Sequence, residues 1–210
     1  MIRFSHVTKI YDDKPVLQID NFNLERSIYW LTGINGSGKT TLMRMMAGMI
    51  PFQGDIQLED IQLRQQPISY RRLVNFAEAE PMYPGFISGI ELVKFYQEVR
   101  NADATQTDML IYLFKMKDFI SHSISRYSSG MVKKLSLLLA FIGKPSLMLL
   151  DEPLATLDET AIQILPELMN AYYKEFKTCI IFSSHQHFNM QVLTKPNKIL
   201  ISDQKLQLIA

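Results

Sequence analysis

A glycine-rich loop, Gly33-Ile-Asn-Gly-Ser-Gly-Lys-Thr40, constrains the fold of this 210-residue chain more than any other segment. The loop fits the pattern G-x-x-x-x-G-K-[ST], with the β-prone residues 27–32 before it and a helical pattern over 41–47 after it. Glycines let backbone N–H groups converge on phosphate oxygens, and the start of the helix adds the positive end of its dipole. The sequence therefore predicts a strand, loop and helix that bind a nucleoside triphosphate.

Two side chains of this loop carry its specific chemistry. Lys39 supplies a mobile cation for the outer phosphates, and Thr40 offers a hydroxyl to Mg²⁺. The other loop residues that we expect to bind the nucleotide are Gly33, Asn35, Gly36, Ser37, Gly38 and Thr41.

Composition excludes several classes of protein. The formal charge is +1, from 22 Lys and Arg against 21 Asp and Glu, so no overall basic field indicates a nucleic-acid partner. Cys179 is the only cysteine and lies in an apolar run, which excludes a disulfide framework and favours a core position in a reducing, intracellular setting. No uninterrupted apolar run approaches 18 residues, and no signal-peptide pattern follows Met1, so we expect neither a membrane span nor secretion.

Hydrophobic periodicity predicts an α/β fold with a parallel sheet and the ligand at the carboxyl ends of its strands. Two extended stretches, 2–7 and 16–24, predict an antiparallel hairpin, and 88–117 predicts two or three helices. The elements expected in the second half are a helix over 128–141 capped by Ser128 and Ser129, a buried strand 147–150, a helix 159–175 and a strand 178–183. We expect Pro166 to kink or interrupt the helix 159–175.

Acidic side chains follow the buried strand 147–150. Asp151 can hold Mg²⁺, directly or through water, and Glu152 can orient and deprotonate an attacking water. His185 ends the next apolar strand; a lone histidine there is more often structural, but beside Asp151 and Glu152 we expect it to contact the γ-phosphate and that water.

Taken in order, these segments resemble the ATP-binding-cassette (ABC) ATPase family over essentially the whole chain. The segments that carry the resemblance are Tyr11, the loop 33–40, Tyr-Ser-Ser-Gly-Met at 127–131, Leu-Leu-Asp-Glu-Pro at 149–153, Ala-Thr-Leu-Asp at 155–158 and Ser-Ser-His at 183–185. The resemblance implies a P-loop NTPase fold: a RecA-like parallel sheet core, an antiparallel β-subdomain and an inserted α-helical subdomain. It implies one domain, 1–210, with the core and β-subdomain in 1–87 and 130–210 and the helical subdomain in 88–129.

The resemblance also implies roles for single residues. Tyr11 would stack on the adenine of ATP, Glu152 would be the catalytic base beside Lys39, and His185 would be the switch histidine. Asp158 would belong to the loop that crosses to a partner subunit. These positions match the motifs of the family residue by residue.

The signature segment Ser128–Gly130 implies a dimer. A serine hydroxyl, a glycine N–H and a helix start form an anion site without a cation, and in the family this signature completes the ATP site of the opposite subunit. The usual Leu-Ser-Gly-Gly-Gln form is altered at Tyr127, Ser129 and Met131. A further departure concerns the glutamine loop: its metal contact falls on Glu78 or on Ala79, depending on which neighbouring residues are used to count.

From this resemblance we expect the ATP-hydrolysing subunit of a membrane transporter, similar to bacterial exporters, with ATP and Mg²⁺ as cofactors. Its expected partners are a separate transmembrane permease and either a second copy or a second cassette, which places it in the cytoplasm at the inner face of the membrane. Phe76, Tyr83 and Phe86 either line the groove for the permease or pack internally. The alternatives are a soluble cassette ATPase acting on nucleic acid or a macromolecular assembly, and a small-molecule P-loop kinase, which leaves Ser128–Gly130 unexplained.

Overall fold

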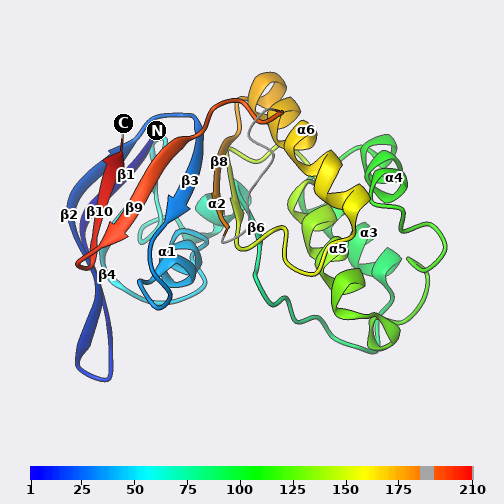
Figure 1. Ribbon diagram of the computed structural model, residues 1–210, viewed down its shortest axis with the longest axis horizontal. Coiled ribbons are helices and arrows are strands. Elements are labelled where there is room, and N and C mark those ends of the chain that lie inside the picture. Colours follow the sequence, from blue (N-terminus) through cyan, green and yellow to red (C-terminus); the bar gives the residue numbers. More distant parts are fainter. Residues whose placement is uncertain (185–191, 210) are drawn as a thin grey trace.

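A six-stranded sheet forms the centre of the computed structural model, which describes residues 1–184 and 192–209 (Figure 1). Its strand order is β10-β9-β3-β8-β7-β6, and every neighbouring pair is parallel except β9 with β10. The strands are β3 (Ile28–Thr32), β6 (Val74–Ala77), β7 (Leu147–Leu150), β8 (Cys179–Ser183), β9 (Asn197–Ser202) and β10 (Lys205–Ile209). The predicted parallel α/β sheet is therefore confirmed.

A smaller antiparallel sheet, of order β2-β1-β4-β5, packs beside it. Its strands are β1 (Ile2–Tyr11), β2 (Lys14–Leu24), β4 (Gln53–Leu58) and β5 (Ile61–Gln62). The predicted hairpin is confirmed as β1 and β2, and its strands extend to a two-residue turn. Asp12 and Asp13 both have positive φ there, +47° and +60°, a conformation that aspartate tolerates better than most residues.

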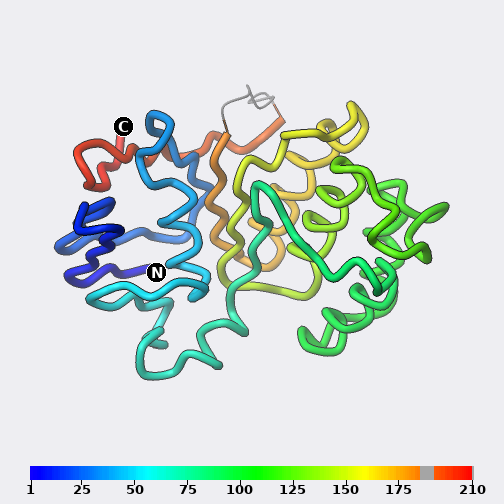
Figure 2. Tube along the Cα trace, turned by 90° about the horizontal axis from the view of Figure 1, so that it is seen from below, coloured from blue at the N-terminus to red at the C-terminus, as the bar shows by residue number. Residues whose placement is uncertain are grey.

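Six α-helices surround the two sheets in the part of the chain that the structure describes. Their bounds are α1 (Lys39–Met46), α2 (Pro67–Arg72), α3 (Gly89–Val99), α4 (Ala104–Leu113), α5 (Ser129–Ala140) and α6 (Glu159–Phe176), with a 3₁₀ turn η1 (Ile124–Arg126) before α5. Helices α3, α4 and α5 gather at the end opposite to the antiparallel sheet in both views (Figures 1 and 2). A capping box between Ser88 and Glu91 starts α3, and Ser128 caps α5 as predicted.

Two apolar clusters cover the two faces of the central sheet. Leu147 and Leu149 join the cluster that contains α1 and the antiparallel sheet, whereas Met148 and Leu150 join the cluster that contains α3 to α6. A strand that is covered on both faces needs apolar residues throughout, which explains the continuous run 147–150. Cys179 is buried in the first cluster, as predicted, and burial raises the pKa of its thiol to about 11.

One of the two effects expected of Pro166, an interruption of α6, does not occur. The helix runs from Glu159 to Phe176 without interruption although it contains Pro166. Pro166 is buried, as are Leu165 and Met169, which join the cluster that contains α3 to α6. Burial of this apolar face stabilises the helix although the proline lacks a backbone N–H.

Among the residues that the structure describes, none of the helices combines the length and the apolar character needed to cross a membrane.

Candidate nucleotide-binding and catalytic site

The glycine-rich loop connects the carboxyl end of β3 to the amino end of α1. At Gly33 φ is +154°, and a Cβ would lie 2.5 Å from Ser37 Oγ and 2.9 Å from the carbonyl oxygen of Ile201. Contacts that short are repulsive, so only glycine fits where the strand turns into the loop.

The Lys39 side chain folds back over this loop. Its Nζ donates hydrogen bonds to the carbonyl oxygens of Gly33, at 2.9 Å, and Ile34, at 3.1 Å. The ammonium is therefore held above the backbone that is expected to contact phosphates. A phosphate bound there would form a charge-assisted hydrogen bond with Lys39.

Thr40 and Asp151 meet although they are 111 residues apart in the sequence. Thr40 Oγ1 donates to Asp151 Oδ2 at 2.7 Å, and Ser183 Oγ donates to Asp151 Oδ1 at the same distance. Asp151 is only 1% exposed. A hydroxyl and a carboxylate side by side form the hard oxygen donor set that Mg²⁺ prefers, so the residues present fit this metal.

Ser183 also orders the residue after Asp151. Its Oγ accepts a hydrogen bond from the backbone N–H of Glu152 at 2.9 Å. Glu152 has a positive φ of +44°, which is uncommon for glutamate and marks a sharp turn of the chain after β7.

A cavity of about 410 Å³ joins most of the predicted site residues. It is lined by Tyr11, Val16, Asn35, Gly36, Gly38, Lys39, Thr40, Thr41, Asp151 and Glu152. Tyr11 is about half exposed at its edge, and the ammonium of Lys9 lies 4.4 Å from the centre of its ring. The carboxyl ends of β3 and β7 therefore meet the β1 strand end around one hollow, as expected for a ligand of a parallel sheet.

The signature residues do not line this cavity. Ser128 Oγ accepts the Met131 N–H at 3.3 Å as the cap of α5. Gly130 packs closely, because a Cβ there would lie 2.7 Å from the carbonyl oxygen of Thr156. Ser128 and Gly130 therefore sit on another surface of the same chain.

Asp158 makes its contacts with residues of its own chain. Its carboxylate caps α6 by accepting the Ala161 N–H at 3.0 Å, and it forms an ion pair with Lys134 of α5. These contacts connect the starts of α5 and α6.

Glu78 is the first residue after β6, and its carboxylate pairs with Arg44 of α1 at 2.9 Å. Ala79 has no side-chain oxygen, so of the two candidates only Glu78 carries a metal-binding group. Glu78 does not line the 410 Å³ cavity, and its role toward a metal stays a prediction. His185 lies outside the described residues.

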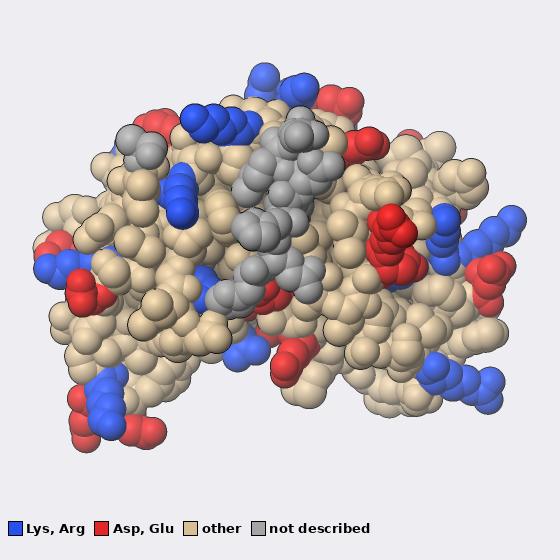
Figure 3. Space-filling model, viewed as in Figure 1, with Lys and Arg blue, Asp and Glu red and all other residues tan. Residues whose placement is uncertain are grey.

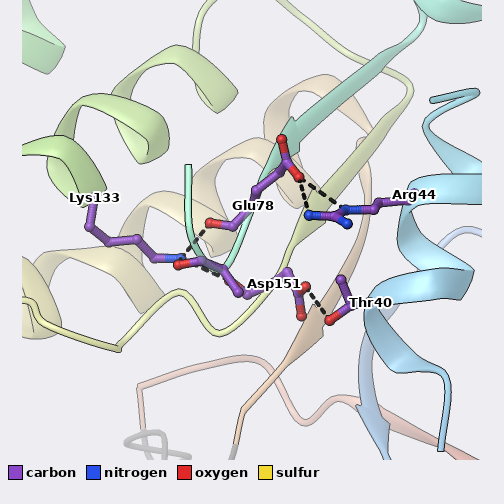
Figure 4. A network of polar contacts seen from close by, with 6 residues as sticks. Thr40, Arg44, Glu78, Lys133 and Asp151 are labelled. Atoms are coloured by element: carbon purple, nitrogen blue, oxygen red, sulfur yellow. Dashed lines mark hydrogen bonds and ion pairs between the residues drawn. The ribbon is translucent and has the colours of Figure 1, made fainter. Parts of the chain in front are cut away.

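Sequence reasoning missed Lys133, which is 1% exposed. Its Nζ donates to the carbonyl oxygens of Glu78, Ala79 and Asp151, at 2.7, 3.2 and 2.8 Å (Figure 4). Burial lowers its pKa to about 8, against the opposing effect of the acidic residues nearby. The available signal was helical spacing, since Lys133 shares a face with the buried Leu137 and Ala140.

Comparisons with known proteins show the family of the chain. The sequence model of a family described as ABC transporter matches residues 17–155. An uncharacterized ABC transporter ATP-binding protein of Bacillus subtilis (strain 168), YybJ, is 30% identical over 193 residues, which cover 89% of this chain and 86% of that protein.

Solved structures share the fold. The structure of an ATP binding subunit of an ABC transporter has a TM-score of 0.87 at 22% identity and covers 100% of this chain and 90% of its own. A dimeric ATP-binding cassette, MJ0796, bound to ADP and Pi, has a TM-score of 0.83 at 16% identity, with 100% and 99% covered.

Proposed function

The chain belongs to the ABC transporter ATP-binding family, and from this premise we propose that it is the ATP-hydrolysing subunit of a membrane transporter, similar to exporters. The membrane-spanning part would be a separate polypeptide, and the chain would work at the inner face of the membrane through it. The observation that carries the proposal is one cavity that joins Tyr11, six residues between Asn35 and Thr41, Asp151 and Glu152.

The cavity residues divide the work of hydrolysis. Loop N–H groups and Lys39 bind the phosphates, and Tyr11 stacks on the base. Thr40 and Asp151 would hold Mg²⁺, which when bound neutralises charge on the outer phosphates. Glu152 orients and deprotonates the attacking water. His185 remains the proposed γ-phosphate contact.

We further propose that two cassettes pair head to tail around two ATP molecules. Support comes from the position of Ser128 and Gly130, which lie outside the cavity of their own chain and are available to a neighbour. The pair would bring each signature over the loop 33–40 of the other subunit. ATP binding then stabilises the dimer, and hydrolysis releases it.

The proposed permease contact lies on the loop before α3. Met82 and Phe86 there are 92% and 88% exposed. Of the three aromatic residues considered from the sequence, Phe76 and Tyr83 pack against the two apolar clusters, whereas Phe86 joins neither. Exposed apolar side chains of this size favour a protein contact.

The charges on the face seen in Figure 3 do not favour the nucleic-acid alternative. Lysine and arginine side chains alternate with acidic ones over the visible face, and neither sign gathers into one patch (Figure 3). A nucleic-acid partner requires a continuous basic surface.

The test is a Glu152→Gln variant examined by size-exclusion chromatography with and without Mg·ATP. We expect ATP binding without hydrolysis, and a shift from monomer to dimer on addition of ATP. Lys39→Ala serves as the matched control, which we expect to stay monomeric because it lacks the phosphate cation. A Glu152→Gln protein that hydrolyses ATP normally as a monomer contradicts the proposal.

The transport role needs a separate measurement. Co-expression with a candidate permease allows copurification and transport to be compared for wild type and Lys39→Ala. Transport that continues when every copy carries Lys39→Ala rejects the motor role.

A further inference from the structure

Lys133 occupies the point where two strands of the central sheet separate. The β6–β7 ladder ends at the hydrogen bond from the Asp151 N–H to the Ala77 carbonyl oxygen, at 2.9 Å. Beyond this bond the two strands no longer pair, and the Lys133 ammonium bridges them instead. It donates to the carbonyl oxygens of Glu78 and Ala79, which follow β6, and of Asp151, which follows β7.

The ammonium matches these acceptors in number, because it carries three hydrogens and meets three carbonyl oxygens. A cation that is almost fully buried requires such hydrogen bonds, since it has lost its hydration. Lys133 therefore fixes the separation of two backbone segments that no longer pair with each other.

Both segments send their side chains toward α1 (Figure 4). Asp151 accepts the Thr40 hydroxyl, and Glu78 pairs with Arg44. Lys133 itself projects from the opposite side, from the second turn of α5, five residues after the cap Ser128. It is thus the one described side chain in Figure 4 that contacts the backbones of both Glu78 and Asp151.

We propose that Lys133 is a positioning residue for the metal: by holding the Glu78 and Asp151 backbones together, it keeps the Asp151 carboxylate beside Thr40. This inference rests on the proposed function, because it assumes that Thr40 and Asp151 bind Mg²⁺ with ATP. Lys133 acts through backbone carbonyls and touches neither nucleotide nor metal.

The test uses Lys133→Met, which keeps an unbranched side chain, one atom shorter, and removes its donors. Mn²⁺, as a paramagnetic substitute for Mg²⁺, is titrated into the full chain with a non-hydrolysable ATP analogue and followed by electron paramagnetic resonance. We expect the Kd for Mn²⁺ to rise about tenfold, as for other residues that support metal ligands. The affinity for the analogue in EDTA is expected to stay within about twofold of wild type.

The direction in which the Kd for Mn²⁺ changes distinguishes a positioning role of Lys133 from an effect of its charge alone. Removing a nearby positive charge would by itself tighten Mn²⁺ binding, since it removes repulsion. Weaker Mn²⁺ binding therefore supports positioning, whereas unchanged or tighter binding overturns it.

Asn75→Leu is the matched control. Asn75 is also buried, and its Nδ2 donates to the carbonyl oxygens of Ala140 and Ile142 at the other end of α5, at 2.8 and 2.9 Å. We expect this variant to lose stability but to keep the wild-type Kd for Mn²⁺. An equal weakening in Asn75→Leu would assign the effect to general loosening and overturn the proposal.

A second variant covers the case in which Lys133→Met does not fold. Lys133→Gln keeps two donors without the charge. We expect its Kd for Mn²⁺ to lie between those of wild type and Lys133→Met. If Lys133→Met does not fold, we expect the Kd of Lys133→Gln to exceed that of wild type. A Kd equal to that of wild type overturns the inference. Wild-type protein that neither binds the analogue nor hydrolyses ATP would instead reject the proposed function.

Discussion

The backbones of Gly130 and Thr156 approach each other so closely that a side chain at residue 130 should destabilise the fold. Gly130→Ala places a methyl group 2.7 Å from the Thr156 carbonyl oxygen. Thr156 already has a positive φ of +62°, so it has little freedom to move away. We expect the free energy of unfolding to fall by about 1–3 kcal/mol, as for other overpacked sites. Urea denaturation measures this change.

Ser129→Ala is the control for that substitution. Ser129 lies in the same first turn of α5 and is exposed, so an alanine there meets no neighbour and favours the helix. Gly130→Ala protein that is as stable as Ser129→Ala protein would show that the Thr156 segment yields without cost.

Sequence reasoning found the residues whose type reveals their chemistry. The pairing of Thr40 with Asp151 follows from two motifs at the carboxyl ends of parallel strands. Lys133 and Ser183 were not assigned roles, because their contacts depend on how distant strand ends meet. A lysine is ordinarily exposed, so its burial could not be read from its type alone.

At the scale of secondary structure, Pro166 gives a second prediction. Pro166→Ala restores a backbone N–H inside α6, which can then donate to the carbonyl oxygen of Ile162 four residues earlier. We expect the free energy of unfolding to rise by about 1 kcal/mol, less than the usual cost of a helical proline because the ring also makes buried contacts. Chemical denaturation measures the change.

Gln163→Ala is a suitable comparison, since Gln163 is exposed on the same helix. We expect its stability to stay within about 0.5 kcal/mol of wild type. A Pro166→Ala protein that is less stable than wild type would mean that contacts of the ring outweigh the restored hydrogen bond.

Long periodic elements and the wholly apolar strand β7 were predicted well, whereas several other short or terminal strands were not. The bounds of α5 and α6 agree with the expected 128–141 and 159–175 within a residue or two. Sequence analysis did not identify β6, β9 or β10 as strands of the sheet. The four residues of β6 are too few to show a period, and their strand conformation depends on pairing with β7.

At the scale of the whole molecule, the separation of the cavity from the signature gives a third prediction. Lys39→Ala and Ser128→Arg should each abolish ATPase activity, the first by removing the phosphate cation and the second by blocking the neighbour's site. In an equimolar mixture each mixed dimer holds one intact site, formed by the loop of the Ser128→Arg copy and the signature of the Lys39→Ala copy. We therefore expect the mixture to recover activity that neither variant has alone, up to about half of wild type if every dimer is mixed and the sites act independently.

Steady-state ATPase assays on the mixture measure this recovery. The control is each variant mixed with itself, which should stay inactive. A mixture without any activity would contradict sites shared between subunits, provided that both variants are folded by circular dichroism.

The class of the fold was predictable, but the order of its strands was not. A loop of the type 33–40 between a strand and a helix indicates a parallel sheet. The placement of β3 between β8 and β9 joins segments about 150 and about 170 residues apart, and no local pattern encodes such a pairing.

Helix α5 is fastened along its length while its first turn stays at the surface. Asn75 holds its far end, and Lys133 holds it near the start. A neighbour that docks on Ser128 would contact the end of a helix held at two points, so its displacement would be transmitted to the strand ends of the sheet. Displacement of the first turn of α5 would therefore reach the Glu78 and Asp151 backbones through the buried Lys133 ammonium.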